Sequence, residues 1–217
     1  MIDPRAVILD LDGVLVETEP LKALAHSETV AQFGGRVAPR FYAKVMGRPH
    51  GDVRDAFLAQ GRVAVNGDDY AAAFEARYAE LLATRTQLTR GAADLVTRAR
   101  SRGMKIALAT SSRRWMTDQV LAITGCAQAF DCVICAEDVD AHKPAPHCYQ
   151  AALERLGIGA GAALAVEDSD SGVAAAVAAG IPVIALRHSL NQGHEFPGAA
   201  RIVESLDEVL AAEEVAA

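Results

Sequence analysis

The chain has 217 residues, of which 51% are hydrophobic and 23% charged, and its formal net charge is −7. This length and composition are typical of a folded protein with one sizeable core, or one core and a small inserted domain, and they exclude a disordered chain. The acidic balance and an aromatic content of 5% argue against nucleic acid and anionic membranes as partners.

The N-terminal part of the chain predicts one short strand followed by a helical block. Residues 6–9, Ala-Val-Ile-Leu, form an apolar run typical of a strand that is buried on both faces of a parallel sheet. Apolar residues at helical spacing then predict helices at 21–33, 40–46, 51–60 and 68–86. No strand pattern interrupts this block.

From Leu88 onward, strands and helices are expected to alternate. We expect strands at 104–109, 131–135, 162–166, 182–186 and, at an edge, 201–203, with helices at 91–102, 114–123, 146–156, 171–179 and 206–212. Such alternation predicts right-handed βαβ units and a parallel sheet.

The predicted fold class is α/β, with a Rossmann-like three-layer core built on a parallel sheet and a small α-helical cap domain inserted after the first strand. The predicted core comprises residues 1–18 and 88–217, and the predicted cap comprises 19–87. In open α/β sheets ligands bind beyond the carboxyl ends of the strands, so the residues that follow each strand are the candidates for function.

Four of the predicted strand ends carry polar residues. They are Asp10 and Asp12 after the first strand, Thr110, Ser111 and Ser112 after the second, Lys143 in the loop after the third, and Glu167 and Asp168 after the fourth. Taken singly, each group has an ordinary explanation as a turn residue or a helix cap. Buried carboxylates, however, are costly to desolvate unless a cation or hydrogen bonds compensate them. The strand ends therefore predict a charged functional site.

Taken together and in this order, the segments LDLDG, LATSS, HKPAPHCY and VEDSDSG resemble the four motifs of the haloacid dehalogenase superfamily, which consists mainly of phosphatases and phosphomutases. The resemblance covers nearly the whole chain. The segment ETEP and the helical insertion further resemble the subfamily with a small helical cap, which includes phosphoglycolate phosphatase and β-phosphoglucomutase.

The resemblance implies a Mg²⁺-dependent phosphatase that hydrolyses a small phosphorylated metabolite, a sugar or sugar-acid phosphate, through an aspartyl-phosphate intermediate. Asp10 would be the nucleophile, and Asp12 the general acid and base. Thr110 and Lys143 would stabilise the transferring phosphoryl group. A phosphate dianion repels a carboxylate unless cations neutralise both, which explains the need for Mg²⁺. The implied metal ligands are Asp10, Asp168, Glu167 and the main-chain carbonyl of Asp12.

Two other functions stay open. A β-phosphoglucomutase-type phosphomutase, which returns the phosphoryl group to the substrate, is the close alternative. A non-catalytic phosphate-binding or phospho-acceptor domain is the more distant one, because it leaves Asp12 without a role. Haloacid dehalogenases proper are not known for the second aspartate, so Asp12 favours phosphate chemistry over carbon–halogen chemistry.

Substrate selection is expected to reside in the cap and at the start of the helix that follows Thr110. Arg48 and His50 lie in a predicted cap loop that resembles the substrate-contacting loop of related sugar-phosphate enzymes. Ser111, Ser112 and Arg113 are expected to bind the substrate as well: positions matching Ser112 and Arg113 help hold a second phosphate in the phosphoglucomutase-like branch, and helix N-termini and arginines bind anions. The alternative is that Arg48, His50 and Arg113 are ordinary solvated side chains.

Two positions depart from the family pattern. Glu17 stands in the predicted hinge where aspartate is usual, and His147 stands where aspartate is frequent after Lys-Pro-Ala-Pro. We interpret His147 as a helix cap of little catalytic weight, and we expect Glu17 to alter cap closure or polarity slightly.

All four cysteines lie within residues 126–148, together with His142 and His147, which raises the question of a zinc site. Cys132 and Cys135, however, flank Val-Ile in a predicted strand, where a separation of three directs the side chains to opposite faces. The cysteines are better interpreted as small hydrophobic residues in a reduced compartment.

The first residues contain no basic segment followed by an apolar one, and no run approaches the ~18 apolar residues of a membrane span. The sequence therefore predicts a cytoplasmic protein without a membrane or nucleic-acid partner, and we expect a monomer whose ligand is a small phosphate ester.

Overall fold

The sheet of the computed structural model, which describes residues 4–211, is parallel throughout. Its six strands lie in the order β3-β2-β1-β4-β5-β6. Their bounds are β1 (Ala6–Leu9), β2 (Lys105–Ala109), β3 (Cys132–Ile134), β4 (Ala163–Glu167), β5 (Val183–Leu186) and β6 (Arg201–Val203). The strand order reverses between β1 and its neighbours β2 and β4, which makes the carboxyl end of β1 the topological switch point.

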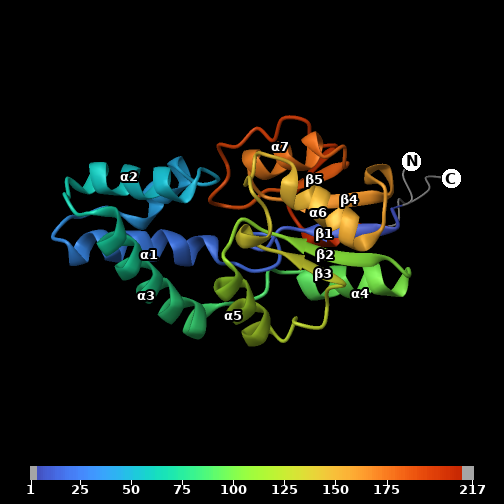
Figure 1. Cartoon of the computed structure of the whole chain (residues 1–217), viewed down its shortest axis with the longest axis horizontal. Coiled ribbons are helices and arrows are strands. Elements are labelled where there is room, and N and C mark those ends of the chain that lie inside the picture. The colour runs from blue at the N-terminus through green and yellow to red at the C-terminus, as the bar shows by residue number, and fades with distance from the viewer. Residues whose placement is uncertain (1–3, 212–217) are drawn as a thin grey trace.

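Helices cover both faces of this sheet, with α4 and α5 on one side and α6 and α7 on the other (Figure 1). Their bounds are α4 (Ala92–Ser101), α5 (Arg114–Thr124), α6 (His147–Leu156) and α7 (Asp170–Ala178). Residues of β1 alternate between the layers, because Val7 and Leu9 belong to the core under α4 and α5, whereas Ala6 and Ile8 belong to the core under α6 and α7. The expected three-layer α/β fold is therefore confirmed.

A helical unit lies between β1 and β2 in the chain and to one side of the sheet in space (Figure 1). It contains α1 (Glu19–Gln32), the 3₁₀ helix η1 (Pro39–Lys44), α2 (His50–Gly61) and α3 (Gly67–Arg85). Its two connections to the core are paired, since Glu17 N donates to Gln87 O at 3.0 Å and Thr89 N donates to Leu15 O at 3.0 Å. The domain limits at 18/19 and 87/88 stay predictions.

The cap also contacts the core on both sides of the strand ends. The guanidinium of Arg113 lies 2.5 Å from the Glu75 carboxylate on α3, and Gln119 donates to the carbonyl of Ala79 at 3.1 Å. On the opposite side, a Cβ placed on Gly47 would lie 3.3 Å from the Cβ of Ser169. The space between cap and core is therefore enclosed from two directions.

Three predictions of local structure were wrong. Residues 40–44 belong to η1 and residues 45–46 to the turn after it, so no α-helix forms there. The final segment forms only a 3₁₀ turn at Leu206–Glu208, because Val209 is extended and Leu210 has a positive φ of 59°, which a right-handed helix does not allow. Arg98 and Arg102 donate to the carbonyls of Leu206, Val209 and Leu210, and residue 212 lies outside the described residues. His147 is the first residue of α6, after Pro146 at the N-cap, and makes no side-chain cap bond.

The cysteines do not gather into a metal site. All four are free thiols, and within residues 4–211 the one group of side chains with metal-binding geometry consists of carboxylates. No helix in the same range is both long and apolar enough to cross a lipid bilayer.

Candidate active site

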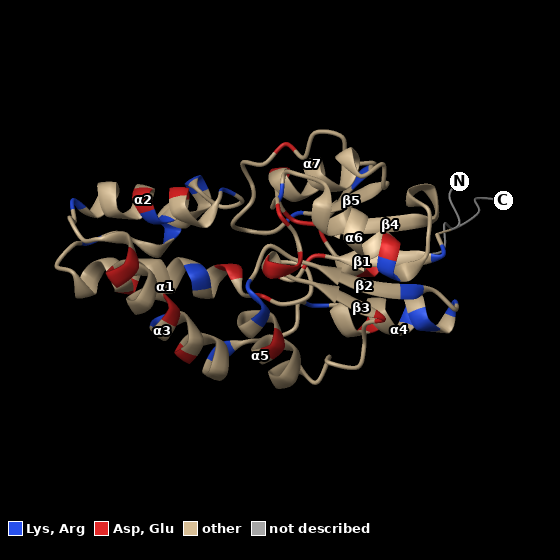
Figure 2. Ribbon diagram, viewed as in Figure 1, with Lys and Arg blue, Asp and Glu red and all other residues tan. Residues whose placement is uncertain are grey.

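Acidic residues gather where the strands end, between the sheet and the cap helices (Figure 2). Asp10 follows β1, Glu167 is the last residue of β4, and Asp168 comes directly after it. Although they carry ionisable groups, their exposed fractions are 7%, 0% and 3%. Because β1 and β4 are neighbours with Leu9 opposite Val166, the next residues of the two strands meet at the same edge.

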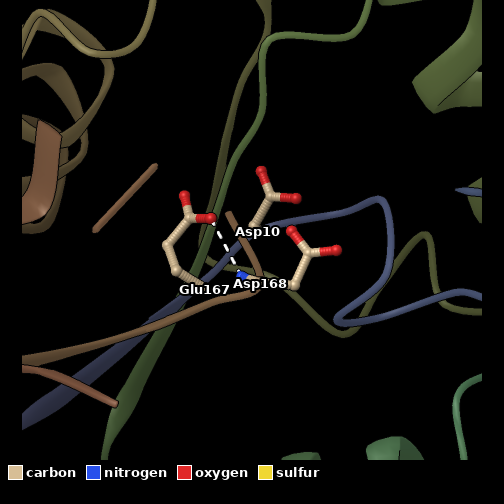
Figure 3. A group of neighbouring side chains, drawn as sticks. All are labelled: Asp10, Glu167 and Asp168. Atoms are coloured by element: carbon tan, nitrogen blue, oxygen red, sulfur yellow. Dashed lines mark hydrogen bonds between the residues drawn. The ribbon is translucent and has the colours of Figure 1, made fainter. Parts of the chain in front are cut away.

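The carboxylates of Asp10, Glu167 and Asp168 each place an oxygen within 4.8 Å of the others (Figure 3). Burial, against the opposing charge of Lys143 and with the help of the neighbouring carboxylates, raises the pKa of Asp10 to about 7. Burial and the neighbouring carboxylates raise the pKa of Asp168 well above its ordinary value. A cation between the carboxylates would offset both the cost of burying their charges and the repulsion between them. Three hard oxygen donors at this spacing fit Mg²⁺, which binds carboxylates in preference to softer groups.

Lys143 is the positive partner of this cluster. Its Nζ lies 2.5 Å from Oδ1 of Asp10, donates to the carbonyl of Ala109 at 2.9 Å and also pairs with Glu167. Burial alone would lower the pKa of Lys143, but the charges of Asp10 and Glu167 outweigh it and raise this pKa above its ordinary value. Lys143 is therefore charged, beside the first carboxylate.

Glu167 is held in place from several directions. The hydroxyl of Tyr149 donates to its Oε1 at 2.7 Å, and the backbone N–H of Asp168 donates to its Oε2 at 3.2 Å. The carboxylate also lies against the first turn of α7, where a Cβ on Gly172 would come 2.0 Å from its carboxyl carbon. Only glycine leaves room for it there, next to the N-terminus of a helix that favours negative charge.

Asp12 has a different set of partners. Thr18 and Ser112 donate hydroxyl hydrogen bonds to its two oxygens, and Lys22 Nζ lies 2.8 Å from Oδ2. Burial would raise the pKa of Asp12, but Lys22 and these hydrogen bonds lower it below its ordinary value. The side chains of Asp10 and Asp12, which are close in the sequence, thus have different surroundings. Of the two, only Asp10 belongs to the metal-binding group.

Sequence reasoning missed Thr18, which lies in the hinge segment ETEP, and Lys22, which lies two residues after that segment. They are four residues apart at the start of α1, a spacing that places both on the side of the helix facing Asp12. From the sequence, this spacing of four residues could have indicated that Thr18 and Lys22 face the same site.

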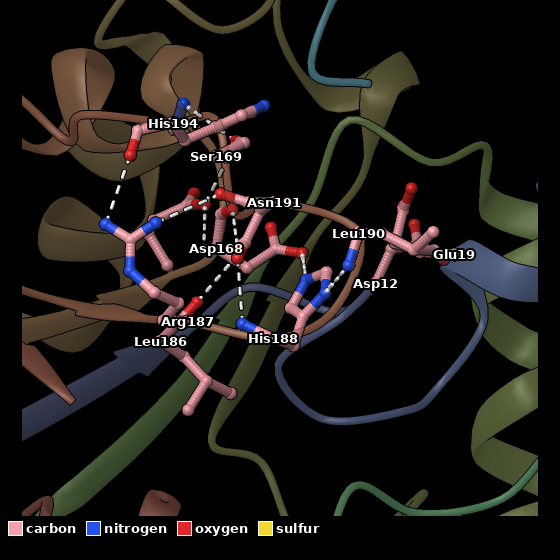
Figure 4. A network of polar contacts seen from close by, with 12 residues as sticks. Asp12, Glu19, Asp168, Ser169, Leu186, Arg187, His188, Leu190, Asn191 and His194 are labelled. Carbon is pink, nitrogen blue, oxygen red and sulfur yellow. Dashed lines mark hydrogen bonds and ion pairs between the residues drawn. The ribbon is translucent and has the colours of Figure 1, made fainter. Parts of the chain in front are cut away.

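The loop after β5 also contributes to the site and was missed. His188 Nε2 lies 2.9 Å from Oδ2 of Asp168, and Asn191 donates to the carbonyls of Asp168 and Leu186 at 2.8 and 2.9 Å (Figure 4). Burial lowers the pKa of His188 to about 4, so a neutral imidazole faces the carboxylate. The sequence could have indicated this loop, because the polar residues Arg187 and His188 follow the fifth strand, but that strand end was not included among the polar strand ends.

Of the remaining predicted site residues, some lie close to the carboxylate cluster and others lie at exposed positions. Thr110 is 2% exposed and its hydroxyl accepts a hydrogen bond from Ser112 N at 2.9 Å, which leaves its proton free to point elsewhere. Ser111 is exposed, and Arg113 pairs with Glu75 of the cap. Arg48 and His50 lie at the cap loop and at the start of α2; both are exposed.

An open parallel sheet with buried carboxylates and a charged lysine at its switch point defines a class of α/β enzymes that bind an anionic substrate with the help of a cation. The chain belongs to the haloacid dehalogenase-like hydrolases, whose family model matches residues 7–186. The expected superfamily and the expected enzyme class, a phosphatase-type hydrolase, are thereby confirmed.

The chain is similar to relatives of its own length. It is 33% identical to protein CbbY of Rhodobacter capsulatus over 90% of both chains. It is 28% identical to a phosphorylated carbohydrates phosphatase of Thermotoga maritima over 87% of this chain and 88% of that one. The structure superposes on CbbY from Rhodobacter sphaeroides, solved in complex with phosphate, with a TM-score of 0.82 and 30% identity over 96% of each chain.

Proposed function

We propose that the protein is a Mg²⁺-dependent phosphatase that acts on a small phosphorylated sugar or sugar acid through an aspartyl-phosphate on Asp10. The observation that carries this proposal is the buried group of Asp10, Glu167 and Asp168 with Lys143 bound to Asp10. The relative named as a phosphorylated carbohydrates phosphatase, and the phosphate bound to CbbY, support a phosphate ester as the substrate.

Asp10 and Asp168, together with Glu167 and the main-chain carbonyl of Asp12, would hold Mg²⁺, which supplies positive charge that offsets the repulsion between a phosphate dianion and a carboxylate. Asp10 then attacks phosphorus, and the ester oxygen leaves. Lys143 orients Asp10 through a direct ion pair and stabilises the negative charge of the transferring oxygens, to which Thr110 donates its hydroxyl hydrogen.

Asp12, whose pKa is low in the free protein, must take up a proton when the phosphate dianion binds; it passes this proton to the leaving alkoxide and later takes one from the water that hydrolyses the aspartyl-phosphate. Its contacts support this role, because Thr18, Ser112 and Lys22 fix both of its oxygens at a position separate from the metal-binding group. The cap, which contacts the core on two sides, excludes other water during the first step.

The decisive experiment measures phosphate release from a panel of phosphate monoesters with Mg²⁺ and with a chelator, for the wild type and for Asp10→Asn. We expect release that requires Mg²⁺ and is lost in the variant. Hydrolysis without metal, or an active Asp10→Asn enzyme, contradicts the mechanism. Conversion of β-glucose 1-phosphate to the 6-phosphate without phosphate release would assign the phosphomutase activity instead, and a stable phosphoenzyme without turnover would assign the phospho-acceptor.

A further inference from the structure

Glu19, the first residue of α1, is an acidic residue that the mechanism above does not use. It is 5% exposed, and its Oε1 accepts a hydrogen bond from Lys22 at 2.9 Å. Its other oxygen, Oε2, is buried and makes no hydrogen bond of normal geometry with the described residues, although the Tyr42 hydroxyl lies near this carboxylate. A buried carboxylate oxygen without a donor costs about 1–3 kcal/mol or more, so such an atom requires an explanation.

The position of Glu19 points to the space beneath the cap. Lys22 contacts both Glu19 and Asp12, at 2.9 and 2.8 Å, so the two carboxylates lie on either side of one ammonium group. The charge of Glu19 also raises the pKa of Asp168, after the larger effect of burial. The Glu19 carboxylate therefore lies one ammonium group away from the proposed general acid, and its charge acts on a proposed metal ligand.

There is room for a ligand beside this residue. Glu19 lines a cavity of about 440 Å³, together with Gly13 and His188. Gly13 packs directly on Asp168, since a Cβ there would lie 1.9 Å from the Oδ2 atom of that residue. The cavity is thus next to the carboxylate cluster without containing it, and a second unpartnered buried atom, Oγ1 of Thr89, belongs to another of its lining residues.

The chemistry of Oε2 restricts what can bind there. A carboxylate oxygen accepts hydrogen bonds and repels a phosphate anion. Lys22, which it shares with Asp12, offsets part of the charge of Glu19, and a neutral donor that needs only one acceptor is sufficient to satisfy Oε2. A hydroxyl group is the neutral donor that a phosphorylated sugar or sugar acid carries on its carbon atoms.

We propose that Glu19 is a specificity-determining residue whose Oε2 accepts a hydrogen bond from a hydroxyl group on the carbon skeleton of the substrate. This inference rests on the proposed phosphatase function. Because the oxygen is buried and otherwise unpaired, an ester without that hydroxyl leaves it unsatisfied, and the enzyme discriminates against such an ester. Glu19 lies on the cap side of the hinge, so the contact forms when the cap covers the substrate.

The test compares Glu19→Gln with the wild type on ribose 5-phosphate, 2-deoxyribose 5-phosphate, glycerol 3-phosphate and phenyl phosphate, which has no hydroxyl group. We expect kcat/KM to fall about 10- to 100-fold for the best hydroxylated ester, and less than about twofold for phenyl phosphate, since a hydrogen bond to a charged group is lost only in the first case. Glu28→Gln, the same change on the outer face of α1, is the matched control and should alter neither value.

Three results would overturn the inference. The first is an equal loss on phenyl phosphate and the hydroxylated esters, and the second is a higher Mg²⁺ requirement, which would assign Glu19 to the hydrated cation. The third is a wild type that hydrolyses phenyl phosphate with the same kcat/KM as every hydroxylated ester; this result would leave the proposed phosphatase function intact. A wild type inactive on all esters would instead refute both proposals. If Glu19→Gln does not fold, Glu19→Asp, which retracts the oxygen but keeps the charge beside Lys22, should show the same selective loss.

Discussion

Two regions of the molecule bury polar side chains in opposite ways. At the strand ends, Asp10 and Lys143 form an ion pair inside the protein. In the interior of the cap, His26 is 2% exposed and stacks on Phe57 and Phe74 at ring distances of 4.9 and 4.2 Å. Its Nδ1 lies 2.9 Å from the Tyr70 hydroxyl, and burial lowers its pKa to about 3, so the imidazole is neutral.

The difference shows how work is divided between the two units. Charge is retained at a high desolvation cost only where it can act on a phosphate and a cation. The cap avoids that cost by neutralising its buried histidine, and it is held together by aromatic packing. Substitutions at the strand ends should therefore change activity most, whereas substitutions inside the cap should change stability and its pH dependence.

The largest effect is expected for Asp10→Asn. Removal of the nucleophile should lower kcat on the order of 10⁴-fold or more with little change in folding, because the amide has the same shape. Phosphate release and thermal unfolding, measured together, check this. The control is Asp118→Asn on the exposed side of α5, which should keep wild-type activity.

The next effect is expected for Lys143→Met, which leaves two buried carboxylates without their shared counter-charge. We expect kcat to fall about 10²- to 10³-fold and the free energy of unfolding to fall by about 3–5 kcal/mol. Urea unfolding and steady-state kinetics measure the two quantities. Lys44→Met, at an exposed position of η1, should change neither, and a stable, active Lys143→Met would refute the importance of this pair.

A smaller effect is expected for Gly172→Ala. Its Cβ would occupy the place of the Glu167 carboxylate, so that side chain must move and carry Lys143 with it. We expect a loss of about 1–3 kcal/mol in unfolding free energy and a detectable fall in kcat. Gly159→Ala, where no atom lies within 4 Å of the added Cβ, provides the control. Equal behaviour of the two variants would contradict the close packing.

The cap should show its own dependence on pH. The pKa of His26 is lower in the folded protein, about 3, than its ordinary value of 6.5, so between these values the unfolded chain binds more protons. The stabilisation is complete above pH 6.5 and is lost as the pH falls toward 3, with a slope of about 1.4 kcal/mol per pH unit for this group.

Urea unfolding between pH 7 and 4 measures that slope. His26→Phe should flatten it, whereas Tyr70→Phe, which removes the hydrogen-bond partner but keeps the imidazole, should retain it at a cost of about 1 kcal/mol. An unchanged slope in His26→Phe would show that other groups produce the acid dependence.

The smallest effect is expected at the contact between cap and core. Arg113 and Glu75 form an exposed ion pair, so Arg113→Ala and Glu75→Ala should each lower unfolding free energy by no more than about 1 kcal/mol. The double variant should lose no more than either single variant, which a double-mutant cycle measures. A selective loss of activity on doubly charged esters in Arg113→Ala alone would support the predicted role of Arg113 in binding a second anionic group.

Much of this molecule follows from local sequence. The apolar run at residues 6–9, followed by Asp10, predicts a central strand with charge at its end, and the alternation after Leu88 predicts the parallel sheet. Local rules failed at residues 206–211, where Leu210 takes a positive φ and arginine side chains from α4 and the turn after it, distant in sequence, donate to the carbonyls of Leu206 and Leu210.

By itself the sequence determined the sheet, the helical insertion and the order of the polar strand ends, because periodicity and turn residues act over a few positions. Only the tertiary structure decided which groups meet: Lys22 with Asp12, His188 with Asp168, and Arg113 with Glu75. It also left Oε2 of Glu19 without a partner. Such contacts depend on how elements far apart in the chain pack against each other. A sequence pattern over a few residues carries no information about that packing.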